Sequence, residues 1–367
     1  MSFYNALFLV LLLTGVFTLK YDKDKKVLMV GNEGNALIPI IILFVIQGFR
    51  SLNVGNDTYK YARFFLHADD PGRFRYSNGK DILYYAWCRI IKMVGSNVVF
   101  FNCCCAFVIF SALYFFISRY SSNKTLSVIL FLTLGLFFAS MNQTRQAMAA
   151  SMLLWAFDRA YNKDIKLTLL FCFAAITIHS TTIVFLPIFL FISVFPMINK
   201  YIVAVFSCGA VIIVVFMRFF LEIFGKLFPF YARYFTNSLF RIRGVTFWRY
   251  GDWGICIIIQ IGLLLCLLGG EEDLKKNRLG YVFACINSIT LAISYLAMSI
   301  MAMERIKQYF MYWYIVMIPY VIATFLKKNK FIGIIIAFMS LLYMWHLGVR
   351  DGHGVIPYIT VLENYIW

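Results

Sequence analysis

Apolar residues along this chain occur in long runs separated by short polar stretches, and this pattern dominates the sequence. Runs of about 20 apolar residues are long enough to cross the hydrocarbon core of a bilayer as helices. The runs are too long and too uniform to be the strands of a membrane barrel. We therefore predict about twelve membrane spans, near residues 3–19, 36–52, 96–118, 125–142, 145–161, 165–179, 181–198, 201–221, 254–270, 279–302, 308–326 and 331–348.

Several of these predicted spans have features of their own. The first lacks a basic segment and a small-residue cleavage site, so it is expected to be a span and not a cleaved signal peptide. The second is short, which indicates a tilted or re-entrant element. Only Ser140–Thr144 separates the fourth from the fifth, which favours a tight hairpin.

Residues 81–95, between the second and third spans, show a different periodicity. Apolar residues recur there at helical spacing, and Arg89 and Lys92 lie on the opposite face. This spacing predicts an amphipathic helix that lies on the bilayer surface. The expected protein is all-α and polytopic, with a single transmembrane domain over residues 1–367 and outward loops at about 53–95 and 222–253 that carry amphipathic helices.

The composition excludes a soluble protein and offers no cofactor site. Hydrophobic residues make up 62% of the chain and charged residues only 14%. The nine cysteines lie mostly inside apolar runs, without the spacing of a metal site or a disulfide framework. No His/Cys cluster, Walker loop or Rossmann glycine pattern is present. We expect no metal ion, nucleotide or other cofactor.

The two cationic residue types are segregated between alternate loops. One set of short loops carries 13 Lys and 3 Arg, which the positive-inside rule places in the cytoplasm. The opposite set carries 5 Lys and 13 Arg, and both termini then face outside. The outward arginines are Arg50, Arg63, Arg73, Arg75, Arg89, Arg145, Arg218, Arg233, Arg241, Arg243, Arg249, Arg305 and Arg350.

An outward surface rich in arginine indicates an anionic ligand such as a lipid diphosphate, because the guanidinium fork binds phosphate bidentately and keeps its proton. The alternative is that arginines reach toward lipid headgroups. That alternative suits Arg73, Arg75, Arg89 and Arg218, which flank surface helices or long loops. Arg50, Arg145 and Arg305 lie in apolar surroundings, where an unpaired charge is costly, and are the better site candidates.

Three polar stretches are expected to meet on the outward side. Arg50 and Asp57 open the first long polar loop. Arg145 and Gln146 lie where one helix passes into the next, and a helix N-terminus there would add backbone donors to an anion site. His179 lies in a break between two apolar runs, where it acts either as a base or as a structural hydrogen-bonding group.

Later stretches on the same side add further candidates. The loop 222–254 is rich in Arg, Tyr and Trp, and includes Arg243 and Arg249. It is either a mobile lid that binds sugar and phosphate or an interfacial aromatic belt, and its outward position argues against nucleic acid. Glu304 and Arg305, beside a helix end, form an ion pair or contact substrate. A glycine-rich turn with a histidine, His353, follows the last span.

Taken in order, these motifs resemble the EpsG family, whose members are Wzy-type polymerases of bacterial surface polysaccharide such as O-antigen. The family's usual Gly-Thr-Asp is Gly-Asn-Asp here, which keeps Asp57. The matching residues are Arg50, Gly55-Asn56-Asp57-Thr58, Tyr61, Arg145-Gln146, Ala149, His179-Ser180, Glu304-Arg305, Tyr309-Phe310 and Gly354-Val355-Ile356-Pro357-Tyr358.

The resemblance implies a metal-independent glycosyltransferase of GT-C type in the bacterial cytoplasmic (inner) membrane. It would join undecaprenyl-diphosphate-linked oligosaccharide units, donor to acceptor, on the periplasmic or outer face, with a chain-length regulator as partner protein. Arg50, Arg145 and Arg305 would hold the diphosphate, assisted by Arg243 and Arg249. Either Asp57 or His179 would be the base. Glu304 would orient an arginine or bind sugar, and Gln146 and Tyr309 would contribute to substrate binding.

Two other functions are considered. An O-antigen ligase or another lipid-linked glycan transferase would share the arginines, but ligases usually have a larger outward domain late in the chain. A flippase or transporter would place charges in mid-span or break helices in repeated halves. No internal repeat is visible, and Arg145 and His179 lie near one face of the membrane.

Overall fold

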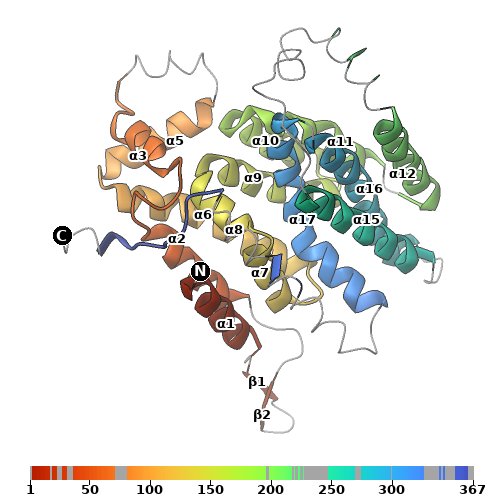
Figure 1. The fold of residues 1–367 in the computed structure, drawn as a ribbon, viewed down its shortest axis with the longest axis horizontal. Helices are drawn as coiled ribbons and strands as arrows, with labels where there is room; N and C mark the ends of the chain where they lie inside the picture. Colours follow the sequence, from red (N-terminus) through yellow and green to blue (C-terminus); the bar gives the residue numbers. More distant parts are fainter. Residues whose placement is uncertain are drawn as a thin grey trace. The chain divides into compact units, whose positions relative to one another are not determined.

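A computed structural model describes most of the chain (Figure 1). The described residues are 2–16, 19–22, 27–30, 36–70, 81–195, 198–216, 247–268, 274–298, 300–325 and 352–362, with isolated positions at 219, 222–223, 226, 339 and 342–343. Their named secondary-structure elements are helices, apart from one antiparallel hairpin of two strands, β1 (Leu19–Asp22) and β2 (Val27–Val30). The all-α prediction therefore holds for the described residues outside this hairpin, which the apolar pattern did not indicate.

The chain divides into two compact units, each described by itself. The first unit comprises Met1–Val194 and Asn329–Trp367, and the second comprises Phe195–Lys328. The helices of the first unit are α1 (Ser2–Val16), α2 (Leu37–Gly48), α3 (Thr58–Leu66), α5 (Ile82–Val94), α6 (Val98–Tyr120), α7 (Lys124–Thr133), α8 (Leu136–Asn142), α9 (Thr144–Tyr161), α10 (Ile165–Ile178), the 3-10 helix η1 (Ser180–Val184) and α11 (Phe185–Val194).

The second unit is a group of four described helices around α16. Its helices are α12 (Lys200–Val215), α15 (Phe247–Leu268), α16 (Leu274–Ala297) and α17 (Met301–Phe325). α16 packs against each of the other three. Inside the group, Asn287 Nδ2 donates to Gln260 Oε1 at 2.9 Å and Gln260 Nε2 donates to Ser288 Oγ at 3.0 Å. Such hydrogen bonds between apolar helices are typical of helix association in membranes.

All the predicted spans except the last coincide with helices, and the last, 331–348, lies almost entirely outside the described residues. Among the described residues, three helical segments are long and apolar enough to cross a membrane: Val98–Tyr120, Tyr250–Leu268 and Arg278–Ala297. α7 and α8 count as a fourth if the two together are one bent span. The protein is a membrane protein, and the total of twelve spans stays a prediction.

The predicted span 125–142 is not one straight helix. It is bent by 57° between α7 and α8, because Gly135 adopts the left-handed conformation with φ +77° and ends the first helix. α8 then ends at Asn142 and α9 begins at Thr144, so Gln143 alone separates them. The predicted break at 140–144 is therefore reduced to a single non-helical residue.

The predicted amphipathic helix is present as α5. It buries Tyr84, Cys88 and Ile91, which lie on one face at helical spacing, and leaves Ile90 and Met93 exposed. α5 packs against α3, α6 and α10.

The C-terminal segment 352–362, which contains the glycine-rich turn, belongs to the first unit. Ser51 N donates to Ile359 O at 2.9 Å and Val361 N donates to Phe49 O at 3.1 Å, so this segment pairs with the chain that leaves α2. Tyr358 Oη also donates to Ile46 O at 2.8 Å.

Candidate functional site

Residues 140–145, which end α8 and begin α9, form the centre of a polar cluster in the first unit, and we call them the α8–α9 junction. Arg50 reaches this junction from the end of α2. Its Nη1 donates to Gln47 O at 2.6 Å and its Nη2 donates to Thr144 Oγ1 at 3.0 Å. Ser140 Oγ donates to Gln47 Oε1 at 2.7 Å, so α2 contacts the junction a second time, through α8.

The burial of Arg50 distinguishes it from a residue that reaches into the headgroups. Its side chain belongs to the interior, with 1% of the residue exposed. Its two hydrogen-bond acceptors, a carbonyl and a hydroxyl, carry no net charge. Its buried Nε has no hydrogen-bond partner among the described residues. A buried cation with only neutral partners is costly and provides a strong attraction for an anion.

The loop that follows Arg50 is held against both the junction and the C-terminal segment. Asp57 N donates to Asn142 Oδ1 at 2.9 Å, and Asn142 Nδ2 lies 3.3 Å from His353 Nδ1. Gly55 N donates to Gly354 O at 2.6 Å, and Asn56 N donates to His353 O at 3.0 Å. Three segments far apart in the sequence therefore share one set of hydrogen bonds.

Two glycines allow this close approach. Gly55 has φ +99°, and a Cβ there would lie 2.6 Å from Thr58 Oγ1. Gly354 has φ +64°, and a Cβ there would overlap the Asn56 side chain. Both backbone conformations disfavour residues with a Cβ, so the loop and the C-terminal turn fit together only with glycine at these positions.

Arg145 lies in the first turn of α9 and is more accessible than Arg50. Its Nη1 contacts Asp81 Oδ2 at 2.7 Å, and its guanidinium lies over the ring of Tyr84, 5.7 Å from the ring centroid. The side chain is 31% exposed. Burial raises the pKa of the Tyr84 hydroxyl, so the ring beside Arg145 stays uncharged. The neighbouring Gln146 is buried.

The two candidate bases lie in different surroundings. The Asp57 carboxylate is partly exposed and contacts Lys60 Nζ at 2.6 Å. His179 follows the last residue of α10, is half-buried, and shares a hydrogen bond of 2.7 Å between its Nδ1 and Thr181 Oγ1. α9 and α10 pack together and are joined by the short turn Asn162–Asp164, so the end of α10 and the start of α9 lie at one end of the pair. The structure thus brings His179 to the same end as Arg145.

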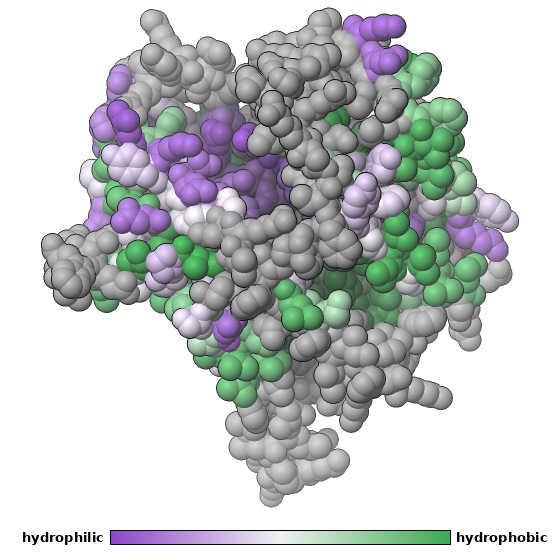
Figure 2. Space-filling model, viewed as in Figure 1, coloured by the Kyte–Doolittle hydropathy of each residue, from purple (hydrophilic) through white to green (hydrophobic). Residues whose placement is uncertain are grey.

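Hydrophilic side chains gather on one part of the visible surface of the protein. Figure 2 shows them at the upper left of the view, over the region where Figure 1 places α3, α5 and α9.

The remaining predicted residues belong to the second unit or lie outside the described residues. Glu304 contacts Lys307 Nζ at 2.7 Å, and Lys307 also contacts Asp252 at 2.9 Å, so the acid pairs with Lys307 and not with its neighbour Arg305. Arg305 is exposed and Tyr309 is buried. Arg249 lies in the first turn of α15, before Asp252, and Arg243 lies outside the described residues.

Several members of the cluster were not predicted as site residues, namely Gln47, Asp81, Asn142 and Thr144. Asn142 and Thr144 carried a usable signal, because they are polar residues at a break between two apolar runs. Asp81 and Gln47 carried none that distinguishes them from ordinary polar positions. In the part of the chain that the structure describes, no group of three or more His, Cys, Asp or Glu side chains could hold a metal ion.

A comparison with protein families identifies the chain. The model of the EpsG family matches residues 36–360, which include the loop after Arg50, the α8–α9 junction and the C-terminal segment. The chain belongs to the EpsG family. Proteins of the EpsG family are membrane proteins of the polysaccharide-polymerase type. Comparisons with curated proteins and with solved structures found no match.

Proposed function

We propose that this EpsG-family protein is a polysaccharide polymerase that joins undecaprenyl-diphosphate-linked oligosaccharide units on the outer face of the bacterial cytoplasmic membrane. The growing glycan would leave its diphosphate carrier and join a sugar hydroxyl of the incoming unit. The product would be O-antigen, capsule or exopolysaccharide. The proposal includes the GT-C architecture of about twelve spans and a chain-length regulator as partner.

The observation that carries the proposal is the meeting of two arginines at the start of α9. Arg50 bonds to Thr144, and Arg145 is the next residue along the chain. The N-terminus of a helix carries partial positive charge and backbone donors, so a cation there is unfavourable unless an anion joins it. A diphosphate matches two guanidinium groups and a helix N-terminus in charge.

The arrangement supports a chemical role for each group. The guanidinium of Arg145, which is accessible, would contact the leaving diphosphate and stabilise the charge that develops on it. Arg50, which is buried, would supply positive charge from behind and hold the junction in place. Guanidinium groups would thus take the part that a metal ion takes in other transferases. Asp57 or His179 would remove the proton of the acceptor hydroxyl.

In the second unit, Arg249, Arg305 and Tyr309 keep their proposed substrate-binding roles, as does Arg243. Glu304 keeps its proposed role in the catalytic centre, where it would orient an arginine or bind sugar. Glu304 and Lys307 already form a charged pair in this unit. Gln146 lies beside Arg145 in the first turn of α9 and would help to position the carrier.

The test is deletion of the gene in its host, followed by electrophoresis of the surface glycan. We expect the ladder of chain lengths to collapse to a single repeat unit on its acceptor, and the intact gene to restore it. Full-length polymer that accumulates on the lipid carrier would instead indicate a ligase. Repeat units trapped on the cytoplasmic side would indicate a flippase. An unchanged ladder would contradict a role in polymer assembly.

A further inference from the structure

The side chain of Asn142 has its orientation fixed by its two neighbours. Asp57 N lies 2.9 Å from one end of the amide, and a backbone N–H can only donate, so that end is the carbonyl oxygen Oδ1. The other end is therefore the amide nitrogen Nδ2, which lies 3.3 Å from His353 Nδ1. The amide nitrogen can only donate, so His353 Nδ1 must accept.

This contact selects one protonation state of His353. A ring nitrogen that accepts a hydrogen bond carries no proton, so the proton of the neutral ring is on Nε2. A doubly protonated ring would direct Nδ1–H against the N–H of the amide, which is repulsive. Asn142 therefore favours a neutral imidazole whose outer nitrogen is a hydrogen-bond donor.

The backbone holds His353 firmly at this position. Its carbonyl accepts from Asn56 N at 3.0 Å, and the next carbonyl, that of Gly354, accepts from Gly55 N at 2.6 Å. The carbonyl of Val355 accepts from the buried hydroxyl of Tyr4 at 2.9 Å. The ring itself is only half-buried, beside the first residues of the loop that begins at Arg50. A donor held in place by the backbone, on a half-buried ring, is suited to contact a ligand.

We infer that His353 is a ligand-binding residue of the candidate site, a neutral imidazole that donates its Nε2–H to a phosphate oxygen of the lipid-linked diphosphate. Asn142 is the positioning residue that sets this tautomer. The identity of the anion rests on the proposed function, whereas the tautomer rests on the contacts of Asn142 alone. In this state Nε2 has no free lone pair, so His353 does not compete with Asp57 or His179 for the role of base.

The inference is tested first by nitrogen NMR of the full-length protein in lipid nanodiscs, with histidine labelled by ¹⁵N. The chain has 4 His, so comparison with His353→Gln protein assigns the signals of this ring. We expect Nε2 to be protonated and Nδ1 not. In Asn142→Asp protein a carboxylate oxygen would face Nδ1 and accept from it, so the proton should move to Nδ1. A proton on Nδ1 in the wild-type protein would overturn the inference.

The ligand is tested in the same sample with farnesyl diphosphate, and with farnesol as the matched probe without phosphate. We expect the diphosphate to shift the His353 Nε2–H signal and farnesol to leave it in place. The shift should be lost in Asn142→Asp protein. A wild-type signal that responds to neither probe, or equally to both, would overturn the assignment of the ligand. Neither result depends on whether the protein polymerises glycan.

The role of His353 is then tested in cells that contain equal amounts of each variant protein. His353→Ala should lower polymer yield about tenfold to a hundredfold, as expected for the loss of one hydrogen bond to a charged group. His353→Gln, which retains a side-chain N–H donor, should rescue most of the yield. The control His67→Ala alters an exposed histidine at the end of α3 and should not affect the ladder. Equal loss in the Gln and Ala variants would contradict a donor role.

Discussion

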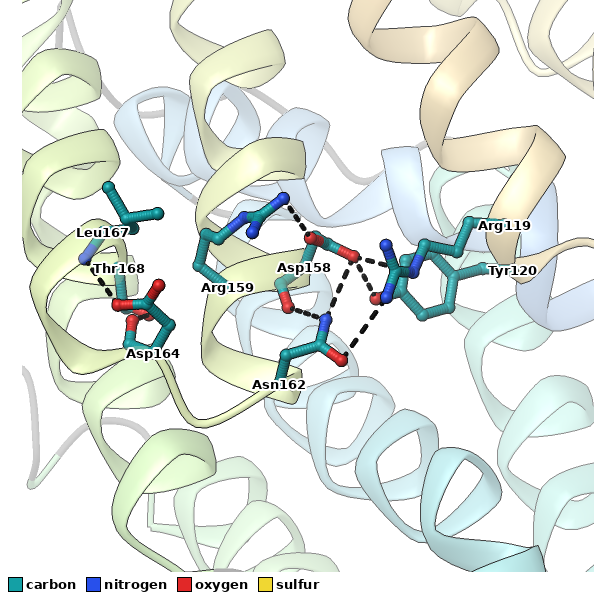
Figure 3. A network of polar contacts seen from close by, with 8 residues as sticks. All are labelled: Arg119, Tyr120, Asp158, Arg159, Asn162, Asp164, Leu167 and Thr168. Atoms are coloured by element: carbon teal, nitrogen blue, oxygen red, sulfur yellow. Dashed lines mark hydrogen bonds and ion pairs between the residues drawn. The ribbon is translucent and has the colours of Figure 1, made fainter.

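Helix α9 carries a charged cluster at each end, and the two clusters bury opposite charges. At its last turn the buried group is an acid, Asp158, which is fully enclosed. Arg119 Nε lies 3.0 Å from its Oδ1 and Arg159 Nη2 lies 3.1 Å from its Oδ2 (Figure 3). Tyr120 Oη donates to the same carboxylate at 2.8 Å. The acid has two cations and a hydroxyl around it.

At the first turn of α9 the buried group is a cation. Arg50 has a carbonyl and a hydroxyl as its acceptors, and Arg145 has one carboxylate, that of Asp81. A buried acid between two cations has its charge compensated, whereas a buried cation with neutral partners attracts an anion. The difference is consistent with a structural role for the Asp158 end and with our proposal that the Arg50 end binds an anionic ligand.

The largest effect is expected from Asp158→Ala. Removal of the buried carboxylate leaves two arginines and a tyrosine hydroxyl without their partner, which should lower the free energy of unfolding by about 3–5 kcal/mol. Thermal unfolding in detergent would measure it. Asp164→Ala is the matched control: that acid caps α10 through Leu167 N, at 3.0 Å, and its loss should cost about 1 kcal/mol. Equal losses of unfolding free energy in the two variants would contradict a special structural role for the buried Asp158 carboxylate.

A large effect on activity, with a smaller one on stability, is expected from Arg145→Ala. Loss of a charged contact to the diphosphate should reduce polymer yield about a hundredfold at equal protein amounts. Arg145→Lys keeps the charge but not the planar fork, and should recover only part of that loss. Glycan electrophoresis with immunoblotting of the protein provides the measurement. A ladder of normal length and yield in Arg145→Ala cells would exclude Arg145 from the site.

An intermediate effect is expected from Gly354→Ala, which tests whether the C-terminal turn is part of the ligand-binding end. The left-handed backbone and the overlap with Asn56 should together lower the free energy of unfolding by about 2 kcal/mol. The polymer yield should fall as well, because His353 moves with the turn. Gly352→Ala is the control, since a Cβ there meets no atom within 4 Å. Matching thermal curves for the two variants would refute this explanation.

The smallest effect is expected from Arg119→Ala. This arginine is 45% exposed, and Asp158 keeps Arg159 and Tyr120 as partners. Because the arginine itself is solvent-exposed and the buried acid keeps two partners, its loss should cost less than about 1 kcal/mol, so both the unfolding temperature and the glycan ladder should stay close to wild type. Loss of the ladder in stable Arg119→Ala protein would assign function to the end that we describe as structural.

The loop charges predict that the Arg145 end of α9 faces outward and that the Asp158 end faces the cytoplasm. Both assignments stay predictions.

Residue spacing explains why the predicted ion pair between Glu304 and Arg305 is replaced by another. Successive residues on a helix do not face each other, so Glu304 could not pair readily with Arg305 once both lay in α17. Residues three apart do face each other, and Glu304 pairs with Lys307.

Local patterns in the sequence were sufficient to predict the membrane character of this protein, the positions of most of its helices, the amphipathic α5 and the resemblance to the EpsG family. Each of these depends on runs, periodicities or ordered motifs, which are properties of neighbouring residues. The apolar pattern did not indicate the bend at Gly135, because the glycine lies within an uninterrupted apolar run and its left-handed backbone is visible only in the fold.

Which polar residues meet could be seen only in the folded chain. Arg50 and Thr144 lie 94 residues apart, Arg145 and Asp81 lie 64 apart, and Asn142 and His353 lie 211 apart. Helix packing brings such pairs together, and no local pattern specifies which buried cation receives a carboxylate. The burial of Arg50 beside neutral partners, and the tautomer that Asn142 imposes on His353, therefore follow from the fold, because both depend on the direction of side-chain atoms across segments distant in sequence.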